Sequence, residues 1–336
     1  MSSAPWHRQA PGFSEIEAAA MRIQSVCRLT PLLESAALNQ RLGARVLVKA
    51  ENLQHHGSFK LRGAYNCIVQ LSAAERARGV VAYSSGNHAQ GVAAAARRLG
   101  VPATIVMPAD APQIKLDNTR QLGAELVLYD RHREDREAIC LRLVAQRGLT
   151  LVPPYEDRRI IAGAGTLGRE LILQARDLGI ALDMLLVNCS GGGLTAGCGL
   201  ALAALSPATR LIAVEPAGFD DTGRSLRSGV REYNDPEARS ICDSLLVHTP
   251  GTLTFGINRR LLAGAVAVSD AGVIAAMRIA RDEFGQVVEP GGAASLAAVL
   301  SGRVEASGKT VAVIFTGGNV DPARYTHWLD ETAEPE

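Results

Sequence analysis

Short apolar runs recur along the chain and alternate with stretches whose apolar residues are spaced as on one face of a helix. The runs are apolar throughout, rather than alternating with polar residues, which is typical of strands covered on both faces. Alternation of such strands with helices predicts an α/β fold built on mostly parallel sheets. The strand candidates are residues 45–51, 80–84, 103–108, 124–130, 149–152, 183–188, 209–215, 264–269 and 310–316.

The stretches between these runs predict helices. Residues 14–28 place apolar side chains three or four positions apart, which is helix spacing. Residues 58–72 are expected to form another helix, with the Ser58 hydroxyl as its N-terminal cap. Further helices are expected over residues 86–100, 112–123 and 133–148.

Composition narrows the class of protein. The chain has 336 residues, of which 47% are hydrophobic and 21% charged, and its formal net charge is +1. This length suggests about two domains, and the small charge gives no reason to expect nucleic acid or a membrane as partner. No apolar stretch reaches the roughly 18 residues of a spanning helix, and residues 1–13 lack the apolar core of a secretory signal. We therefore expect a cytoplasmic protein.

Cysteine and histidine spacing indicates neither disulfides nor a histidine metal site. The six cysteines are scattered and include no C-x-x-C pair, so reduced thiols are expected. His55 and His56 have no carboxylate or cysteine at ligand spacing. The cysteines are Cys27, Cys67, Cys140, Cys189, Cys198 and Cys242.

Residues 163–168, GAGTLG, satisfy the dinucleotide-binding pattern G-x-G-x-x-G. That pattern must leave a strand and open a helix, with an acidic residue at the end of the next strand. Here a polar stretch, YEDRRIIA, precedes it, and Asp183 lies before the next strand. The segment therefore argues against a dinucleotide oxidoreductase and favours a glycine-containing helix start packed against a sheet.

Residues 189–197, CSGGGLTAG, lie between two apolar runs. This arrangement predicts a strand, a tight turn and a helix, with several backbone N–H groups aimed at one place beside the positive end of the helix. An anion site is therefore expected. Leu194, Thr195 and Ala196 stand where a nucleotide P-loop would have its lysine and hydroxyl, so the anion is not expected to be a nucleotide.

Lys60 falls in the first turn of the helix predicted over 58–72, where a cation opposes the helix dipole. Most lysines are solvated surface residues, so the position of Lys60 alone does not indicate a functional role.

Four motifs change that interpretation: SFKLRGAYN (58–66), SSGNHAQGVA (84–93), SGGGLTAG (190–197) and FTGGNVD (315–321) occur in this order. Together they resemble the pyridoxal-phosphate enzymes of the threonine dehydratase and serine racemase family, which have the tryptophan-synthase-like fold type II. The resemblance runs from about residue 14 to 325.

The resemblance implies two domains, each an open, mostly parallel sheet flanked by helices. Residues 1–75 and 157–336 would form a large cofactor-binding domain, and residues 76–156 a small domain that grips the substrate. It also suggests a homodimer that acts on a small amino acid.

The same resemblance implies how pyridoxal 5′-phosphate is bound. Lys60 would form the Schiff base with the aldehyde, and Phe59 would pack against the pyridine ring. Thr316 matches the hydroxyl that meets the ring nitrogen; because it is neutral, it fits elimination better than transamination. Asn87 matches the side chain that bonds the ring hydroxyl, or else serves only the helix start. The phosphate would bind Ser190, Gly191, Gly192, Gly193 and Leu194.

A second helix start matches the loop that grips the substrate α-carboxylate. Ser85 corresponds to the opposite-face base of the racemases, although dehydratases often carry it too. His88 is expected to be structural rather than catalytic. The loop residues are Ser84, Ser85, Gly86, Asn87 and His88.

Glu215, the carbonyl of Phe219 and Asp221 match positions that hold magnesium or calcium in relatives. Hard cations prefer such oxygen ligands. A solvated acidic loop is the alternative.

The implied function is that of a dehydratase, or ammonia-lyase, which converts a β-hydroxy L-amino acid to a 2-keto acid and ammonia. Many relatives have Ala-Asp-Gly facing the substrate, where this chain has Cys242, Asp243 and Ser244. The side chain at 244 changes the pocket and makes hydroxyaspartate and phenylserine candidates beside threonine and serine. The chain ends soon after residue 321, where biosynthetic threonine dehydratases carry a regulatory domain, so a catabolic role is expected.

Two alternatives remain open. One is an amino acid racemase on the same scaffold, which would be recognised by a D-amino acid product. The other is a non-catalytic pyridoxal-phosphate carrier or sensor, against which Lys60, Ser85 and Thr316 argue because a binder needs no base.

Overall fold

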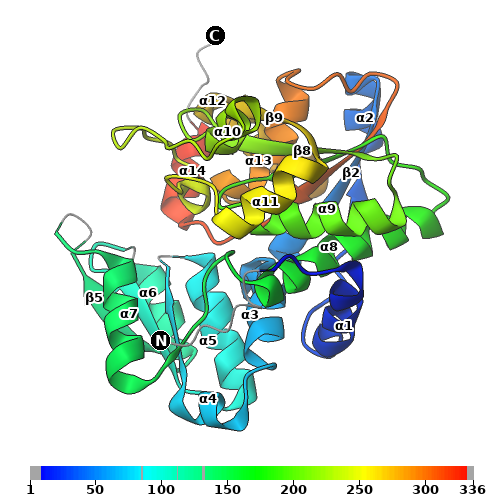
Figure 1. Cartoon of the computed structure of the whole chain (residues 1–336). Helices are drawn as coiled ribbons and strands as arrows, with labels where there is room; N and C mark the ends of the chain where they lie inside the picture. The colour runs from blue at the N-terminus through cyan, green and yellow to red at the C-terminus, as the bar shows by residue number, and fades with distance from the viewer. Residues whose placement is uncertain (1–8, 85, 112, 131–132, 331–336) are drawn as a thin grey trace.

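Two sheets organise the computed structural model, which describes residues 9–84, 86–111, 113–130 and 133–330 (Figure 1). The larger sheet has the strand order β1-β2-β10-β7-β8-β9 and is parallel except for β1, which is antiparallel to β2. Its strands are β1 (Leu32–Glu34), β2 (Arg45–Ala50), β7 (Met184–Asn188), β8 (Arg210–Pro216), β9 (Leu262–Val268) and β10 (Thr310–Phe315).

The smaller sheet is entirely parallel and has the order β5-β4-β3-β6. Its strands are β3 (Val80–Tyr83), β4 (Ala103–Pro108), β5 (Glu125–Tyr129) and β6 (Thr150–Leu151). The α/β class with two mostly parallel sheets, predicted from the apolar runs, is confirmed.

Helices cover both faces of each sheet, as the apolar strands require. Along β10, Val313 and Phe315 join the core on one face of the larger sheet, whereas Ala312 and Ile314 join the core on the other. The first face is covered by α2 (Ala36–Leu42), α12 (Asp270–Phe284), α13 (Pro290–Leu300) and α14 (Pro322–Asp330), and the second by α1 (Phe13–Ile23), α8 (Arg158–Asp177) and α9 (Gly193–Leu205).

The smaller sheet packs against α3 (Lys60–Ile68) and α5 (Asn87–Leu99) on one face and α7 (Arg136–Arg147) on the other. The side chains of α3 thus enter the core of the smaller sheet. The division into a large domain of residues 1–75 and 157–336 and a small domain of residues 76–156 stays a prediction. The remaining helices are α4 (Ala73–Arg78), α6 (Gln113–Gln121), α10 (Asp221–Ser228), α11 (Thr252–Leu261), η2 (Glu51–Leu53), η3 (His55–Gly57) and η4 (Asp243–Leu245). Within the described ranges, no helix is both long and apolar enough to cross a bilayer.

Two local predictions are wrong. Ser58 does not cap α3: it is extended and pairs with Gly317 in an isolated bridge, so the helix begins at Lys60 after an uncapped Phe59. The GAGTLG segment lies inside α8 rather than at a helix start, although Ala164 and Leu167 within it do join the core of the larger sheet. A Cβ on Gly163 would lie 2.7 Å from the Cα of Gly63, so this glycine permits close packing of α8 on α3.

A buried ion cluster fixes α3 to its neighbours. The Arg62 guanidinium, fully buried, donates to Glu51 at 2.7 and 2.8 Å and to Glu170 at 2.7 and 2.8 Å. Lys49, also fully buried, donates to Glu170 at 3.0 Å and to the carbonyl of Thr30 at 2.8 Å. Two cations therefore balance two carboxylates, and the cluster ties α3 to β2, η2 and α8.

Replacing Arg62 by Met should lower the free energy of unfolding by about 3–5 kcal/mol, because Glu51 and Glu170 lose their shared cation in the interior. Urea denaturation of the purified protein measures this change. The exposed Arg45–Glu34 pair offers a matched control: Arg45→Met should change stability by about 1 kcal/mol or less. Equal effects of the two substitutions would contradict the role assigned to the buried cluster.

Candidate active site

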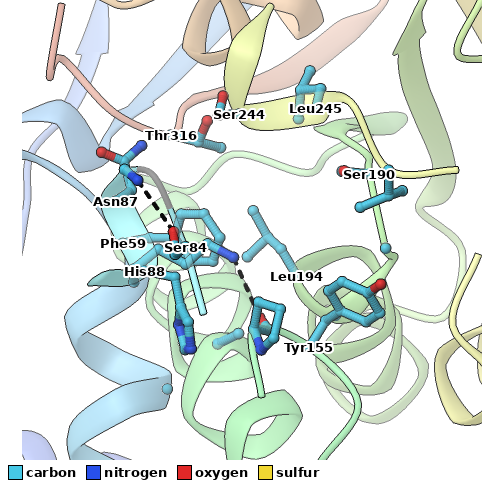
Figure 2. A pocket seen from close by; sticks show the side chains of 18 of the residues that line it. Phe59, Ser84, Asn87, His88, Tyr155, Ser190, Leu194, Ser244, Leu245 and Thr316 are labelled. Carbon is cyan, nitrogen blue, oxygen red and sulfur yellow. Dashed lines mark hydrogen bonds between the residues drawn. The ribbon is translucent and has the colours of Figure 1, made fainter. Parts of the chain in front are cut away.

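The four sequence motifs meet at one pocket, which is lined from both sheets. Figure 2 shows side chains from all four motifs around it, among them Phe59, Ser84, Ser190 and Thr316. All predicted cofactor-binding residues line this pocket: Phe59, Lys60, Asn87, Ser190, Gly191, Gly192, Gly193, Leu194 and Thr316. Ser85, predicted as a catalytic residue, lies outside the described residues.

The glycine turn after β7 presents a row of backbone donors. Within the described residues, no protein acceptor receives the N–H groups of Ser190 to Leu194. Gly192 ends the turn at φ +85°, a conformation that favours glycine, and α9 begins at the next residue. A Cβ on Gly191 would overlap the ring of Tyr155. Unpaired donors at a helix N-terminus, with no side chains in the way, form an anion cradle.

Lys60 places its amine in the same pocket under strong desolvation. The residue is half-buried, its Nζ lies 3.3 Å from the carbonyl oxygen of Pro154, and the Phe59 ring centre is 5.1 Å away. Burial lowers the pKa of Lys60 to about 8, with the Glu289 carboxylate opposing the shift. Near neutral pH the amine is therefore much closer to its neutral, nucleophilic form than an ordinary lysine.

Thr316 is buried after β10 and keeps its hydroxyl hydrogen available. Its Oγ1 accepts a hydrogen bond from Nδ2 of Asn188 at 3.1 Å. The carbonyl of Thr316 accepts from the N–H of Phe59 at 3.2 Å, which ties the start of α3 to the end of the larger sheet. A neutral donor thus faces the pocket from the end of β10.

Asn87 is oriented by two partners that sequence analysis did not single out. Its Nδ2 donates to Oε1 of Glu289 at 2.5 Å, and its Oδ1 accepts from Nδ2 of Asn319 at 2.7 Å. Burial, followed by the charge of Asp243, raises the pKa of Glu289 to about 8. The amide is held from both ends, which is more than a helix start requires.

The loop before α5 brings Ser84 and Gly86 into the pocket lining, and the first turn of α5 brings His88. The hydroxyl of Ser84 accepts from the N–H of Gly86 at 3.1 Å. His88 is buried, and its Nε2–H donates to the carbonyl of Val152 at 2.9 Å. Burial, with the charge of Lys60, lowers the pKa of His88 to about 3, so the imidazole is neutral and packs structurally.

The pocket also contains residues that the motifs did not indicate. The Tyr155 ring lies against the glycine turn, and burial raises its pKa to about 12. Arg136, the first residue of α7, stands 5.2 Å from the ring centre of Tyr83. Lys115 of α6 pairs with Asp243 of η4 at 2.5 Å across the pocket. Tyr155, Arg136 and Lys115 sit on helices and loops of no special pattern, so no sequence signal marked them. Asp243 belongs to the segment that the sequence analysis expected to face the substrate, and it does line the pocket.

The predicted metal ligands lie together at the end of β8, outside the pocket lining. Glu215 is fully buried and accepts from the N–H groups of Thr222 and Gly223 at 2.8 and 2.9 Å. Burial, with the neighbouring Asp221 charge, raises the pKa of Glu215 to about 8. Across the described part of the chain, no group of three His, Cys, Asp or Glu side chains is placed to hold a metal ion.

Comparison with known proteins agrees with this geometry. Residues 23–317 match the family described as pyridoxal-phosphate dependent enzyme. The chain is 42% identical to L-threo-3-hydroxyaspartate ammonia-lyase of Pseudomonas sp, over 96% of this chain and 99% of that protein. It is 37% identical to serine racemase of Schizosaccharomyces pombe, over 96% of this chain and 98% of that protein. Among solved structures, serine racemase of maize superposes with a TM-score of 0.89 at 34% identity, over 95% of this chain and 96% of that structure's chain.

The depressed pKa of Lys60 can be measured directly. With cofactor removed, labelling of Lys60 by acetic anhydride, followed by peptide mass spectrometry, should rise with pH through a midpoint of about 8. The neutral amine is the reactive form, so labelling is suppressed below that midpoint. A midpoint near 10.5, the ordinary lysine value, would contradict the desolvated site.

Proposed function

This chain belongs to the pyridoxal-phosphate-dependent enzyme family, and from that premise we propose that it is an ammonia-lyase acting on a β-hydroxy L-amino acid. The products are a 2-keto acid and ammonia. The residues present fit the cofactor: the unpaired N–H groups of Ser190 to Leu194 suit its phosphate, and the buried Lys60 amine suits its aldehyde.

The bound cofactor supplies a conjugated ring that accepts the electron pair left when the substrate α-proton is removed. Lys60 would hold the cofactor through Nζ, and the same amine would be the base that takes the substrate α-proton. With a pKa of about 8, a larger fraction of the amine is neutral near pH 7 than in an ordinary lysine, and the neutral amine can still accept a proton. Thr316 would offer a neutral hydroxyl to the ring nitrogen, which would favour elimination. Ser84 and Gly86, before α5, and the N-terminus of α5 at Asn87 would bind the α-carboxylate.

We propose a substrate with a second carboxylate, of the L-threo-3-hydroxyaspartate type. The observation that carries this proposal is Arg136, which lines the pocket and forms no ion pair with any described residue. Lys115, the neighbouring cation, is already balanced by Asp243. An unbalanced guanidinium in a pocket favours a carboxylate ligand through paired, charge-assisted hydrogen bonds. Threonine, serine and phenylserine have no second carboxylate to offer.

A racemase on the same scaffold is the second candidate, supported by the similarity to serine racemase. Both reactions begin with removal of the α-proton, and they differ in whether the β-hydroxyl leaves. Ser244 lines the pocket, but its side chain does not select between the two outcomes. Detection of D-amino acid would identify this activity.

Further proposals concern the metal, the assembly and the setting. A magnesium or calcium ion at Glu215, the Phe219 carbonyl and Asp221 is supported by Oδ2 of Asp221, which is buried and finds no hydrogen-bond partner among the described residues. The N–H bonds that Glu215 already accepts weigh against it. A homodimer, a cytoplasmic location and a catabolic role remain proposals that rest on the sequence analysis alone.

The purified holoenzyme should show a visible cofactor band that changes on addition of L-threo-3-hydroxyaspartate, with release of keto acid and ammonia. L-threonine, L-serine and phenylserine complete the substrate panel. The Lys60→Ala variant should show no turnover, because the group that moves the α-proton is absent. Turnover near the wild-type rate in Lys60→Ala, or a cofactor band that changes without keto acid, would contradict the proposal.

Arg136→Gln should reduce kcat/KM for L-threo-3-hydroxyaspartate about 10- to 100-fold, the effect of losing a charged hydrogen bond of roughly 1.5–3 kcal/mol. The kcat/KM for L-serine should change little, because serine has no distal carboxylate. Arg133→Gln, at an exposed position shortly before α7, is the matched control. A parallel loss for both substrates would show that Arg136 acts on the fold or on the α-carboxylate instead.

A further inference from the structure

Two carbonyl groups of the glycine turn are held by side chains of α11. The Gly191 carbonyl accepts from Oγ1 of Thr254 at 2.6 Å and from the N–H of Gly251 at 3.4 Å. The Gly192 carbonyl accepts from Nδ2 of Asn258 at 3.1 Å, in addition to its helical bond. Both side chains are buried, with 0% of Thr254 and 1% of Asn258 exposed.

The planar peptide bond turns this restraint into an orientation of donors. In a trans peptide, the N–H of a residue points opposite to the carbonyl of the residue before it. Because α11 holds the carbonyls of Gly191 and Gly192, the N–H groups of Gly192 and Gly193 are turned away from α11. Both residues line the pocket, and no described acceptor receives these N–H groups.

The helix that supplies these bonds is itself anchored beside the pocket. Both carboxylate oxygens of Glu156 accept from the N–H of Leu253 at 3.1 Å, and one accepts from the N–H of Thr254 at 3.2 Å. Glu156 therefore caps the start of α11, and it directly follows Tyr155, whose ring lies against the glycine turn. A Cβ on Gly192 would lie 2.6 Å from Nδ2 of Asn258, so the turn and α11 are in close contact.

We propose that Thr254 and Asn258 are positioning residues for the cofactor phosphate. Neither touches the anion; each fixes a peptide plane so that its N–H donor is preorganised to bind phosphate. A preorganised donor costs no rearrangement on binding, whereas a turn with free carbonyls must be ordered by the ligand. The inference rests on the proposed pyridoxal-phosphate chemistry and is independent of which amino acid is the substrate.

The test compares pyridoxal phosphate with pyridoxal, which lacks only the phosphate. Thr254→Val should weaken pyridoxal phosphate binding about 10-fold, equivalent to about 1.4 kcal/mol, and change pyridoxal binding by less than about 2-fold. Affinities are measured by titration of the apoenzyme, followed by the visible cofactor band and by equilibrium dialysis. Thr254→Ser keeps the hydroxyl and should restore the wild-type ratio. Thr252→Val, an exposed position on the same helix, is the matched control.

Each outcome bears on the inference. An equal loss of both ligands in Thr254→Val, or no loss of either, overturns the positioning role. Should the valine variant fail to fold, Asn258→Ala gives an independent measurement of the same ratio through Gly192. A wild-type protein that binds neither ligand would instead refute the proposed cofactor chemistry. A wild-type protein that prefers pyridoxal phosphate, with variants that keep the same preference, would refute only the positioning role.

Discussion

Five consecutive backbone N–H groups, from Ser190 to Leu194, have no acceptor within the described protein, and the arrangement of the pocket depends on them. A buried donor without a partner costs about 1–3 kcal/mol, so a fold keeps such a row only where something else satisfies it. The turn between strand β7 and helix α9 creates the row, and α11 and Tyr155 pack against this turn. The three glycines carry no side chains, so the N–H groups stay accessible. A phosphate group is the ligand that such a row of donors fits.

The cradle sets where the remaining chemistry must lie. Lys60 reaches the pocket from α3, whose uncapped start is tied to Thr316 by a backbone bond and whose first turn is fixed by the Arg62 cluster. The cluster is internally neutral, so it holds the helix without charging the pocket. Desolvation alone then accounts for the lowered pKa of Lys60. Position and reactivity of the amine thus come from separate parts of the structure.

Sequence patterns predicted the elements far better than the contacts between them. The α/β class and the cofactor family are confirmed, because continuous apolar runs and four ordered motifs are local signals. The Ser58 cap was wrong because a distant bridge to Gly317 holds that residue extended. Arg136 and Glu289 were missed because only the packed fold brings them to the pocket. Roles for the individual site residues remain proposals, and Ser85 lies outside the described residues.

The most direct test of the account is the chemical identity of the lysine that carries the cofactor. Reduction of the holoenzyme with sodium borohydride, digestion and mass spectrometry of the peptides would locate the pyridoxyl group. The account predicts that it is attached to Lys60, in the peptide containing SFKLRG. Attachment to Lys49, Lys115 or Lys309, or no attachment to any lysine, would contradict the assignment of Lys60 and with it the proposed reaction.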